Sequence, residues 1–481
     1  MELNPKNIKE NLSKIGKKEA SALLKEWAIS SNDLRLRKDA LELFGSLDDR
    51  KNFKFFEHVF LSDEDLEIRM IAGKILEDKY IKHKKLIPLL EYSLKKINKF
   101  EQKFLVVEIL NRIDTRASRK IIKNFLKTYI KAKLERKIKE FPKEIFTKEY
   151  QFALSDHILN VCFNLILYDY YIYECGYNIS LRNGLIILLN CEGANLNSIK
   201  NIPALNRLLH LEHLLLHRNN IEKINGLEDL KKLKVLGLSS NKIENIENLE
   251  DLSFLEELNL SENKIESIKN LNFLKNLKKL NLEANLISEI KSLESLKSLE
   301  DLNLNKNKIT EIKNISNLIN LKRLSFSFNQ ITSTSRLGAL ENLIWLTLND
   351  NKIFRIQGLE GLHNLKVLNF TNNMITKIEN LENLDNLERL EFSNNKIQKI
   401  TGLKSLLKLN SLYLNDNNIK IMEGIDYLDN LIILNIENNQ ISEYNDTYKE
   451  KLKKLYYIYL SGNPLTPKSW ICYKKHMRRY P

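Results

Sequence analysis

Leucines and asparagines recur in a fixed order along the second half of the chain. An asparagine stands at every twenty-second position from Asn219 to Asn439, and Asn463 follows after a slightly longer step. Each lies in the frame LxxLxLxxNxIxxIxxLxxL, which in one unit is Leu233, Leu236, Leu238, Asn241, Ile243, Ile246, Leu249 and Leu252. A period this regular over half of the chain predicts a stack of structural repeats.

The spacing of the apolar residues predicts the elements of each repeat. Two leucines separated by one residue point to the same side of a short strand, and the residue between them faces away. After the strand the apolar spacing changes to three, which predicts a turn or a short 3₁₀ segment with its isoleucines inward. We expect the asparagine at the bend to cap backbone groups and to adopt an unusual backbone conformation. Stacked repeats would then share a ladder of amides.

With this frame, residues 185–481 resemble the leucine-rich-repeat solenoids. Two groups have repeats of this length: the leucine-rich-repeat regulatory subunit of protein phosphatase 1 with its relatives, and the bacterial internalins. The resemblance implies an α+β chain with a right-handed solenoid, a parallel sheet on the concave face, and 3₁₀ or turn segments on the convex side. It identifies the fold more firmly than the binding partner.

Helical spacing dominates the amino-terminal part of the chain. The segment Asp33–Phe44 aligns with Asp65–Leu76, and residues 99–110 follow at a similar interval. This weak repeat resembles HEAT-like helical hairpins, an all-α domain. The resemblance implies that an aspartate near one helix start and an arginine further along, Arg37 or Arg69, bridge neighbouring units.

Four segments follow from these patterns. We expect a HEAT-like helical domain at 1–150, an aromatic-rich junction with the amino-terminal repeat cap at 151–205, twelve leucine-rich repeats at 206–465, and a basic carboxyl-terminal cap or tail at 466–481. The tyrosines between residues 168 and 177 are expected to pack at the junction.

The first repeat departs from the frame, as an end unit should. Leu185 begins its predicted strand, and Asn197 stands one full period before Asn219. In this register Glu192 and Ala194 replace the strand leucines.

The net charge of +14 raises the question of an anionic partner. Residues 1–190 carry 36 basic and 27 acidic side chains, and residues 191–465 carry 35 of each. Nine basic residues and one acid lie between Arg119 and Lys139, and the last sixteen residues hold five basic residues and no acid. These two segments suit nucleic acid or anionic membrane, although a solvated helix face explains the first as well.

Motifs for catalysis and metal binding are missing from the sequence. It contains no GxxxxGK phosphate loop and no HExxH zinc motif, and we expect no enzymatic activity and no cofactor. His213 and His217 share one side of a strand but stand about 13 Å apart, too far for one ion.

The cysteines and the apolar segments indicate a cytoplasmic protein without a transmembrane segment. The four cysteines have no framework spacing, which favours a reducing compartment. The polar amino terminus lacks the apolar core of an export signal, which disfavours surface adhesion of the internalin type.

The residues that flank the inward leucines line the strand face, and some of them are typical of interface hot spots. Exposed tryptophan, tyrosine and arginine are enriched at such positions, and the phosphatase-regulator resemblance implies acidic and aromatic contacts on the same face. The candidate partner-binding residues are Glu257, Glu262, Asp301, Arg323, Phe328, Trp345, Asp350, Arg389, Glu391 and Tyr413.

We therefore predict a non-enzymatic scaffold that binds a protein partner on the concave face. The resemblance suggests a phosphatase or another signalling enzyme as the partner, and a small-molecule substrate is not expected. The alternative is association with nucleic acid or anionic membrane through the basic helical domain and tail.

Overall fold

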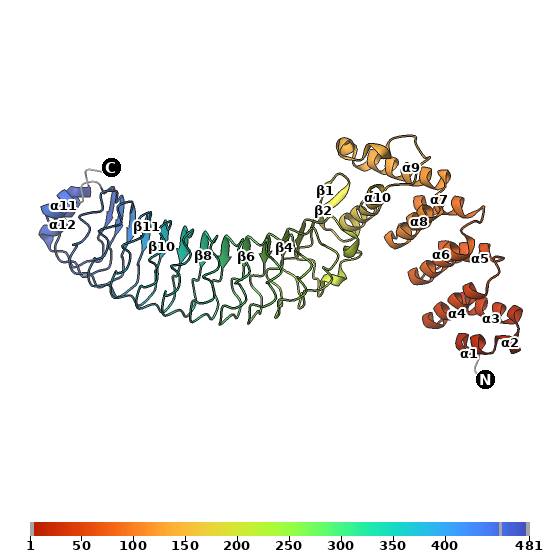
Figure 1. Ribbon diagram of the computed structural model, residues 1–481, viewed down its shortest axis with the longest axis horizontal. Helices are drawn as coiled ribbons and strands as arrows, with labels where there is room; N and C mark the ends of the chain where they lie inside the picture. Colours follow the sequence, from red (N-terminus) through yellow and green to blue (C-terminus); the bar gives the residue numbers. More distant parts are fainter. Residues whose placement is uncertain (1–3, 452–454, 478–481) are drawn as a thin grey trace. The chain divides into compact units, whose positions relative to one another are not determined.

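The computed structural model describes residues 4–451 and 455–477. It divides into two compact units, residues 1–186 and residues 187–481 (Figure 1). The boundary lies inside the segment predicted as a junction. Arg478 and Arg479 of the predicted basic tail lie outside the described residues.

The first unit is helical. Its α-helices are α1 (Pro5–Glu10), α2 (Leu12–Ile15), α3 (Lys17–Ser30), α4 (Leu34–Leu47), α5 (Phe53–Ser62), α6 (Leu66–Tyr80), α7 (Leu86–Lys96), α8 (Phe100–Ile113), α9 (Arg116–Lys133) and α10 (Asp156–Asp169). Shorter helical segments are η1 (Glu135–Glu140), η2 (Lys143–Ile145) and η3 (Tyr170–Glu174), and strand β1 (Asn178–Arg182) follows.

The three aligned sequence segments form α4, α6 and α8, and α6 packs against both α4 and α8. The expected bridge between units is only partly correct. Asp33 and Asp65 instead cap their own helices by accepting backbone N–H groups, at 2.9 Å from Arg35 and 3.0 Å from Ile68. Arg37 forms its ion pair with Asp63, because the turn before α6 brings that carboxylate within reach.

Tyrosines of the predicted junction pack within the helical unit. The rings of Tyr170 and Phe100 lie 4.4 Å apart between centroids, and Tyr171 is buried beside Tyr177. These contacts join η3 to α8 and to the segment before β1.

The second unit consists of short strands joined by turns. Its strands are β2 (Leu185–Asn190), β3 (His213–Leu215), β4 (Val235–Gly237), β5 (Glu257–Asn259), β6 (Lys279–Asn281), β7 (Asp301–Asn303), β8 (Arg323–Ser325), β9 (Trp345–Thr347), β10 (Val367–Asn369), β11 (Arg389–Glu391), β12 (Ser411–Tyr413), β13 (Ile433–Asn435) and β14 (Tyr457–Tyr459). The other elements are η4 (Ile199–Asn201), η5 (Leu205–Arg207), α11 (Asp446–Lys451) and α12 (Pro467–Met477).

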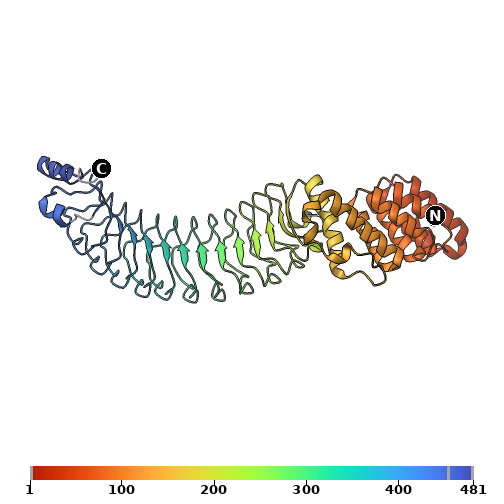
Figure 2. The same cartoon turned by 90° about the horizontal axis from the view of Figure 1, so that it is seen from above.

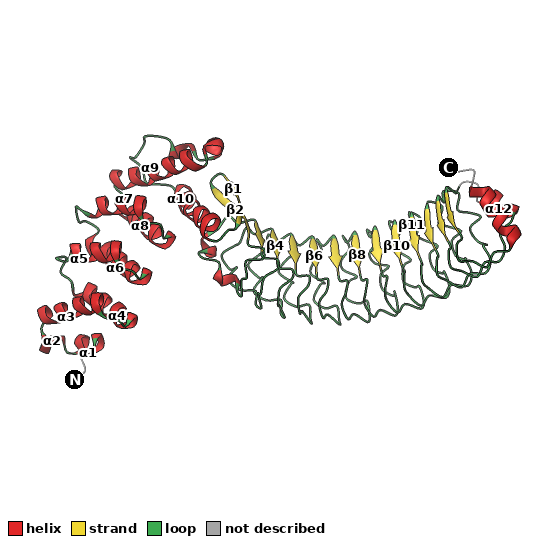
Figure 3. Ribbon diagram, turned by 180° about the vertical axis from the view of Figure 1, so that it is seen from behind, coloured by secondary structure: helices red, strands yellow, loops and turns green. Residues whose placement is uncertain are grey.

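From β3 to β13 each strand pairs in parallel with the next at an offset of one sequence period, as Arg323 with Trp345 shows. The strands form one row, which Figure 2 shows from above, and they line the concave side of the solenoid (Figure 3). The predicted inward leucines and isoleucines are buried, for example Leu302, Leu304 and Ile309 at 0% exposure. The predicted solenoid is confirmed.

The ladder asparagines are buried and connect neighbouring repeats. Asn307 Nδ2 donates to the carbonyls of Leu304 and Asn305 in its own turn, at 3.2 and 3.0 Å, and to Leu282 O of the preceding repeat at 3.0 Å. Its Oδ1 accepts the Ile287 N–H at 3.0 Å. The same bonds recur from Asn241 to Asn439, so the side chain satisfies backbone groups that water cannot reach.

The expected unusual backbone conformation belongs to the residue before each ladder asparagine. Glu262, Phe328 and Asp350 have φ of 55°, 57° and 57°, whereas the asparagines after them are outside the left-handed region. The left-handed residue turns the chain so that the next side chain points into the core. Non-glycine residues occupy this position at a cost of about 1 kcal/mol each, which the buried amide bonds offset.

The register predicted for the first repeat is wrong. In the structure Leu189 lies opposite Leu214, and the separation of these two residues is three positions longer than the repeat period. Leu189 and Cys191 therefore fill the inward strand positions that were predicted for Glu192 and Ala194. A turn at 192–195 accommodates the extra length. Asn197 is consequently exposed and takes no part in the ladder.

We predict that Asn307→Ala destabilises the solenoid by about 3 kcal/mol, because it leaves buried carbonyl and N–H groups unsatisfied. Hydrogen exchange of the Ile287 amide, measured by mass spectrometry, should become faster. Asn320→Ala is the matched control, because Asn320 makes one exposed bond to Lys297 O and its loss should change stability by less than about 0.5 kcal/mol. Equal exchange in the two variants would contradict the role of the ladder.

Candidate functional site

The strand face carries two columns of charged residues that pair across neighbouring repeats. At the amino-terminal edge of the strands, Lys and Glu alternate with the period of the repeat. The resulting ion pairs are Lys234 with Glu212 at 3.2 Å, Lys278 with Glu256 at 2.7 Å, Lys322 with Glu300 at 2.8 Å, and Lys366 with Glu388 at 2.8 Å. Most of the charge on this edge is therefore compensated within the solenoid.

The second column, one residue further along, includes five of the predicted site residues, and three of them form ion pairs across neighbouring strands. Glu257 pairs with Lys279 at 2.5 Å, and Asp301 pairs with Arg323 at 2.8 Å. These cross-strand pairs occupy the carboxylates and the guanidinium that we expected to meet a partner. Exposed ion pairs contribute little to stability, so a partner could replace them at small cost.

Both columns lose their charge at β9. Ile344 takes the place of the Lys or Glu and is 37% exposed, and Trp345 follows with 45% exposure. Within the part of the chain that the structure describes, the Trp345 indole packs on no other aromatic ring and under no cation. Ile344 and Trp345 thus form an exposed apolar pair, which we call the β9 step. The surface around it consists of paired charges.

Phe328, Asp350 and Glu262 lie at the opposite end of the strands from Trp345. They occupy the left-handed turn position, five residues beyond the Trp345 column and three residues after their strands end. Phe328 is 51% exposed. Asp350 accepts Nδ2 of Asn372 at 2.7 Å, and Glu262 accepts the Ser240 hydroxyl at 2.8 Å. The structure therefore separates Phe328 from Trp345.

Arg389, Glu391 and Tyr413 interact with one another. Arg389 Nε donates to Glu391 at 2.5 Å, and its guanidinium lies 4.8 Å from the Tyr413 ring centroid. Asn369 Nδ2 also donates to Glu391 at 2.8 Å. This cluster lies on β10 to β12, so it begins one strand after Trp345.

A second apolar surface lies at the last strands. Ile432, Tyr456, Tyr457 and Tyr459 are all more than 40% exposed. Ile433 pairs with Tyr457 in register, so these side chains lie on the adjacent strands β13 and β14 or on the residue directly before each strand.

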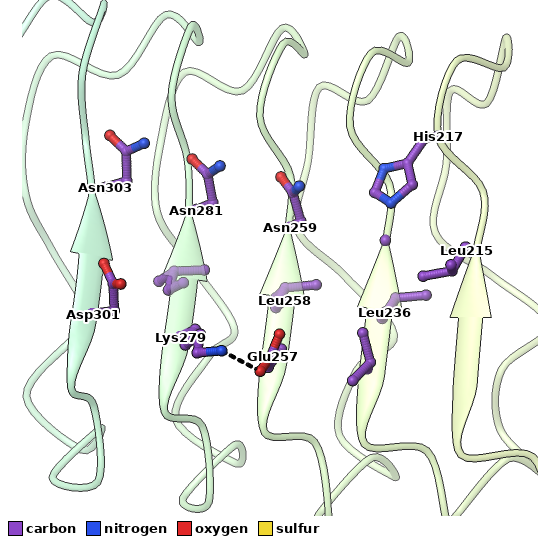
Figure 4. Close-up of a pocket in the computed structure, with 13 residues that line it drawn as sticks. Leu215, His217, Leu236, Glu257, Leu258, Asn259, Lys279, Asn281, Asp301 and Asn303 are labelled. Carbon is purple, nitrogen blue, oxygen red and sulfur yellow. Dashed lines mark hydrogen bonds and ion pairs between the residues drawn. The ribbon is translucent and has the colours of Figure 1, made fainter. Parts of the chain in front are cut away.

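A shallow hollow of about 360 Å³ lies over β3 to β7 (Figure 4). The His217 ring leans over Gly237, where an added Cβ would lie 2.3 Å from Nε2. His217 Nδ1 accepts the Ser239 N–H at 3.2 Å, so the neutral ring carries its proton on Nε2. Burial is the main reason why the pKa of His217 lies below its ordinary value.

A row of asparagines beside His217 offers hydrogen-bond donors. Oδ1 of Asn259 and of Asn281 each accepts the N–H two residues further on, both at 3.0 Å. Their Nδ2 groups have no hydrogen bond among the described residues. Together with neutral His217, these amide groups can form hydrogen bonds with a polar surface of a partner. The arrangement is therefore suited to recognition.

Sequence reasoning missed Ile344 and the contact between His217 and Gly237. Reading the column one residue before Trp345 at the period of the repeat would have found Ile344, because every earlier member from Glu212 is charged. The contact of His217 with the next strand requires the three-dimensional register.

The basic segment at 119–139 is partly engaged within its own unit. Arg119 donates to the carbonyls of Tyr150 and Gln151 at 2.7 and 2.6 Å, and Lys123 donates to Glu149 O at 2.7 Å. Helix α9 ends at Lys133, and η1 continues the segment.

Among residues 4–451 and 455–477, no group of three or more His, Cys, Asp or Glu side chains could hold a metal ion. None of the helices in these ranges has the length and apolarity needed to cross a membrane.

The parallel strand row, the buried leucines and the asparagine ladder define a leucine-rich-repeat protein. A family model described as leucine-rich repeats in two copies matches residues 209–251 and 253–295. An internalin (inlF) from Listeria monocytogenes is 32% identical, with 61% of this chain and 85% of that chain covered and a TM-score of 0.56. The chain therefore belongs to the leucine-rich-repeat family.

A second similar structure is a leucine-rich-repeat protein from Leptospira interrogans. It is 27% identical, with 60% of this chain and 81% of that chain covered and a TM-score of 0.55. No curated protein matched the chain. Internalins are one of the two groups that the repeat length indicated.

We predict that His217 makes the stability of the solenoid sensitive to acid. Its pKa is lowered in the folded state, so the unfolded chain binds the proton more readily, and stability present above pH 6.5 is lost as the pH falls toward the folded-state pKa. The melting temperature of the wild type should fall more between pH 7 and pH 5 than that of His217→Gln. Identical pH profiles for the two proteins would contradict this assignment.

Proposed function

We propose that the chain is a non-enzymatic scaffold whose concave strand face binds a protein partner at the β9 step. The observation that carries the proposal is the loss of both ion-pair columns at Ile344 and Trp345, which leaves an exposed tryptophan and isoleucine among compensated charges. Hot spots at protein interfaces are typically such large side chains, surrounded by contacts that exclude water.

The curved strand row supports a protein rather than a small molecule as the partner. Neighbouring strands lie about 4.8 Å apart, so Trp345, Val367 and Arg389 span about 10 Å across β9 to β11. The Arg389 cluster with Glu391 and Tyr413 would extend the contact toward the carboxyl end, and Glu257 and Asp301 would extend it toward the amino end.

For the class of partner, we propose a phosphatase or another signalling enzyme. This rests on the repeat length and on acidic and aromatic residues at the strand face, both of which resemble the regulatory subunit of protein phosphatase 1. The helical unit, in which α4, α6 and α8 stack in succession, is proposed as a HEAT-like domain.

We predict that Trp345→Ala lowers the yield of the bound partner by about 30-fold, which corresponds to about 2 kcal/mol for a hot-spot tryptophan. The measurement is affinity capture from the native cell with the full chain, quantified by mass spectrometry. Phe354→Ala is the matched control, because Phe354 is in the same repeat and 59% exposed but lies outside the strand.

Phe328→Ala tests the opposite end of the strand face separately. If Trp345→Ala retains every partner that the wild type captures, the β9 step is not the binding centre. Binding of purified protein phosphatase 1 to the wild type, and its loss in Trp345→Ala, would support the class of partner. A steep loss of binding with added salt would instead indicate phosphate contacts.

A further inference from the structure

The helical unit contains a groove that the proposed function of the solenoid does not use. It lies on α7, α8 and α9, which Figure 1 labels and which pack against one another. The groove has a volume of about 680 Å³. Ile121 and Phe125 of α9 are partly exposed and supply apolar surface, and the almost fully buried Leu94 of α7 also lines the groove. A groove of this size and character is within the range of binding sites.

Five lysines surround this apolar surface, and one acid accompanies them. The lysines are Lys95, Lys103, Lys127, Lys131 and Lys133, and the acid is Glu91. The groove lining therefore has a formal charge of +4.

Three of the lysines have partners in the protein. Lys95 pairs with Glu91 at 2.7 Å, and Lys133 pairs with Asp169 at 2.6 Å. Lys127 donates to Thr147 O at 3.1 Å. Only Lys95 and Lys133 are paired with a carboxylate, so the uncompensated positive charge lies on Lys103, Lys127 and Lys131. Of these three, Lys127 is already bound to a backbone carbonyl.

Lys103 and Lys131 make no hydrogen bond or ion pair within residues 4–451 and 455–477. Lys131 is exposed at the rim, and Lys103 reaches the groove from α8, where it is half-buried. Burial lowers the pKa of Lys103. An anion placed beside Lys103 would restore the interactions that its ammonium group loses on burial.

We propose that this groove binds an acidic amphipathic helix of a partner protein. Two adjacent helices form a natural furrow for a third, whose apolar stripe would meet Ile121 and Phe125. The length of α7 allows an occupant of about three turns, roughly 16 Å. The charge of the lining matches several carboxylates along a helix better than the single charge of a fatty acid.

The test uses the full chain and a fluorescein-labelled peptide of about 14 residues, with leucines along one helical face and glutamates on both flanks. Fluorescence anisotropy measures its affinity. Lys131→Glu should weaken binding at least tenfold, because it reverses the charge at the rim. Lys103→Met, which keeps the aliphatic stem and removes the charge, should weaken binding several-fold.

Lys120→Glu is the matched control, because Lys120 is an exposed residue of α9 outside the groove. It should bind the peptide within twofold of the wild type, and equal melting temperatures establish that all variants are folded. The proposal is wrong if Lys120→Glu weakens binding as much as Lys131→Glu. It is also wrong if a peptide of the same composition without the leucine stripe binds equally well.

Two further outcomes would replace the proposal. Absence of saturable peptide binding, together with dodecanoate binding that Lys131→Glu abolishes, would assign the groove to a small anionic amphiphile. Binding to anionic lipid vesicles but not to the peptide would assign it to a membrane surface. Neither outcome would affect the β9 step, which lies in the other unit.

Discussion

The hydrogen bonds of the buried asparagines are the interaction on which the solenoid depends. Each side chain binds carbonyls of its own turn, a carbonyl of the preceding repeat and an N–H of that repeat, as Asn307 shows. These bonds hold successive strands at one register. Every residue between the inward leucines is thereby aligned with its counterpart in the next repeat, and a side chain acquires neighbours on both adjacent strands. The arrangement of side chains on the strand face therefore follows from the hydrogen bonds of the buried asparagines.

Residues 191–465 carry equal numbers of basic and acidic side chains although the chain has a net charge of +14, and the alignment brings many of these opposite charges into contact. Alternating residues such as Glu300 and Lys322 become ion pairs across the strands, so a column compensates its own charge. Pairs of this kind are weak in water and have a small effect on stability. These ion pairs matter more for specificity, because a partner that approaches the strand face meets little net electrostatic potential. In the proposed function, the apolar side chains of Ile344 and Trp345 would then provide the main source of binding free energy on β9.

The sequence predicted the features that depend on the spacing of residues along the chain. It did not predict the contacts that depend on how loops fold back or how helices pack. The inward leucines, the strand positions and the column of Trp345 follow from the repeat period, since periodicity alone determines which side chains share a face. The left-handed residue before each asparagine was misplaced because turn composition varies from Glu262 to Phe328. Partners such as Asp63 for Arg37 depend on how a loop folds back. The groove beside Lys103 depends on helix packing, which carries no local signal.

The two proposed surfaces differ in the physical basis of their affinity, and this difference bears on how a scaffold can act. An aromatic step on a neutral sheet binds mainly by excluding water, and its affinity changes little with ionic strength. A lysine-lined groove binds through charge, and salt weakens it. When both surfaces belong to one chain, a partner that engages them together gains from effective concentration without any new contact. Such a chain would discriminate partners by requiring two unlike features, an apolar anchor and an acidic helix, and a protein with only one would dissociate sooner.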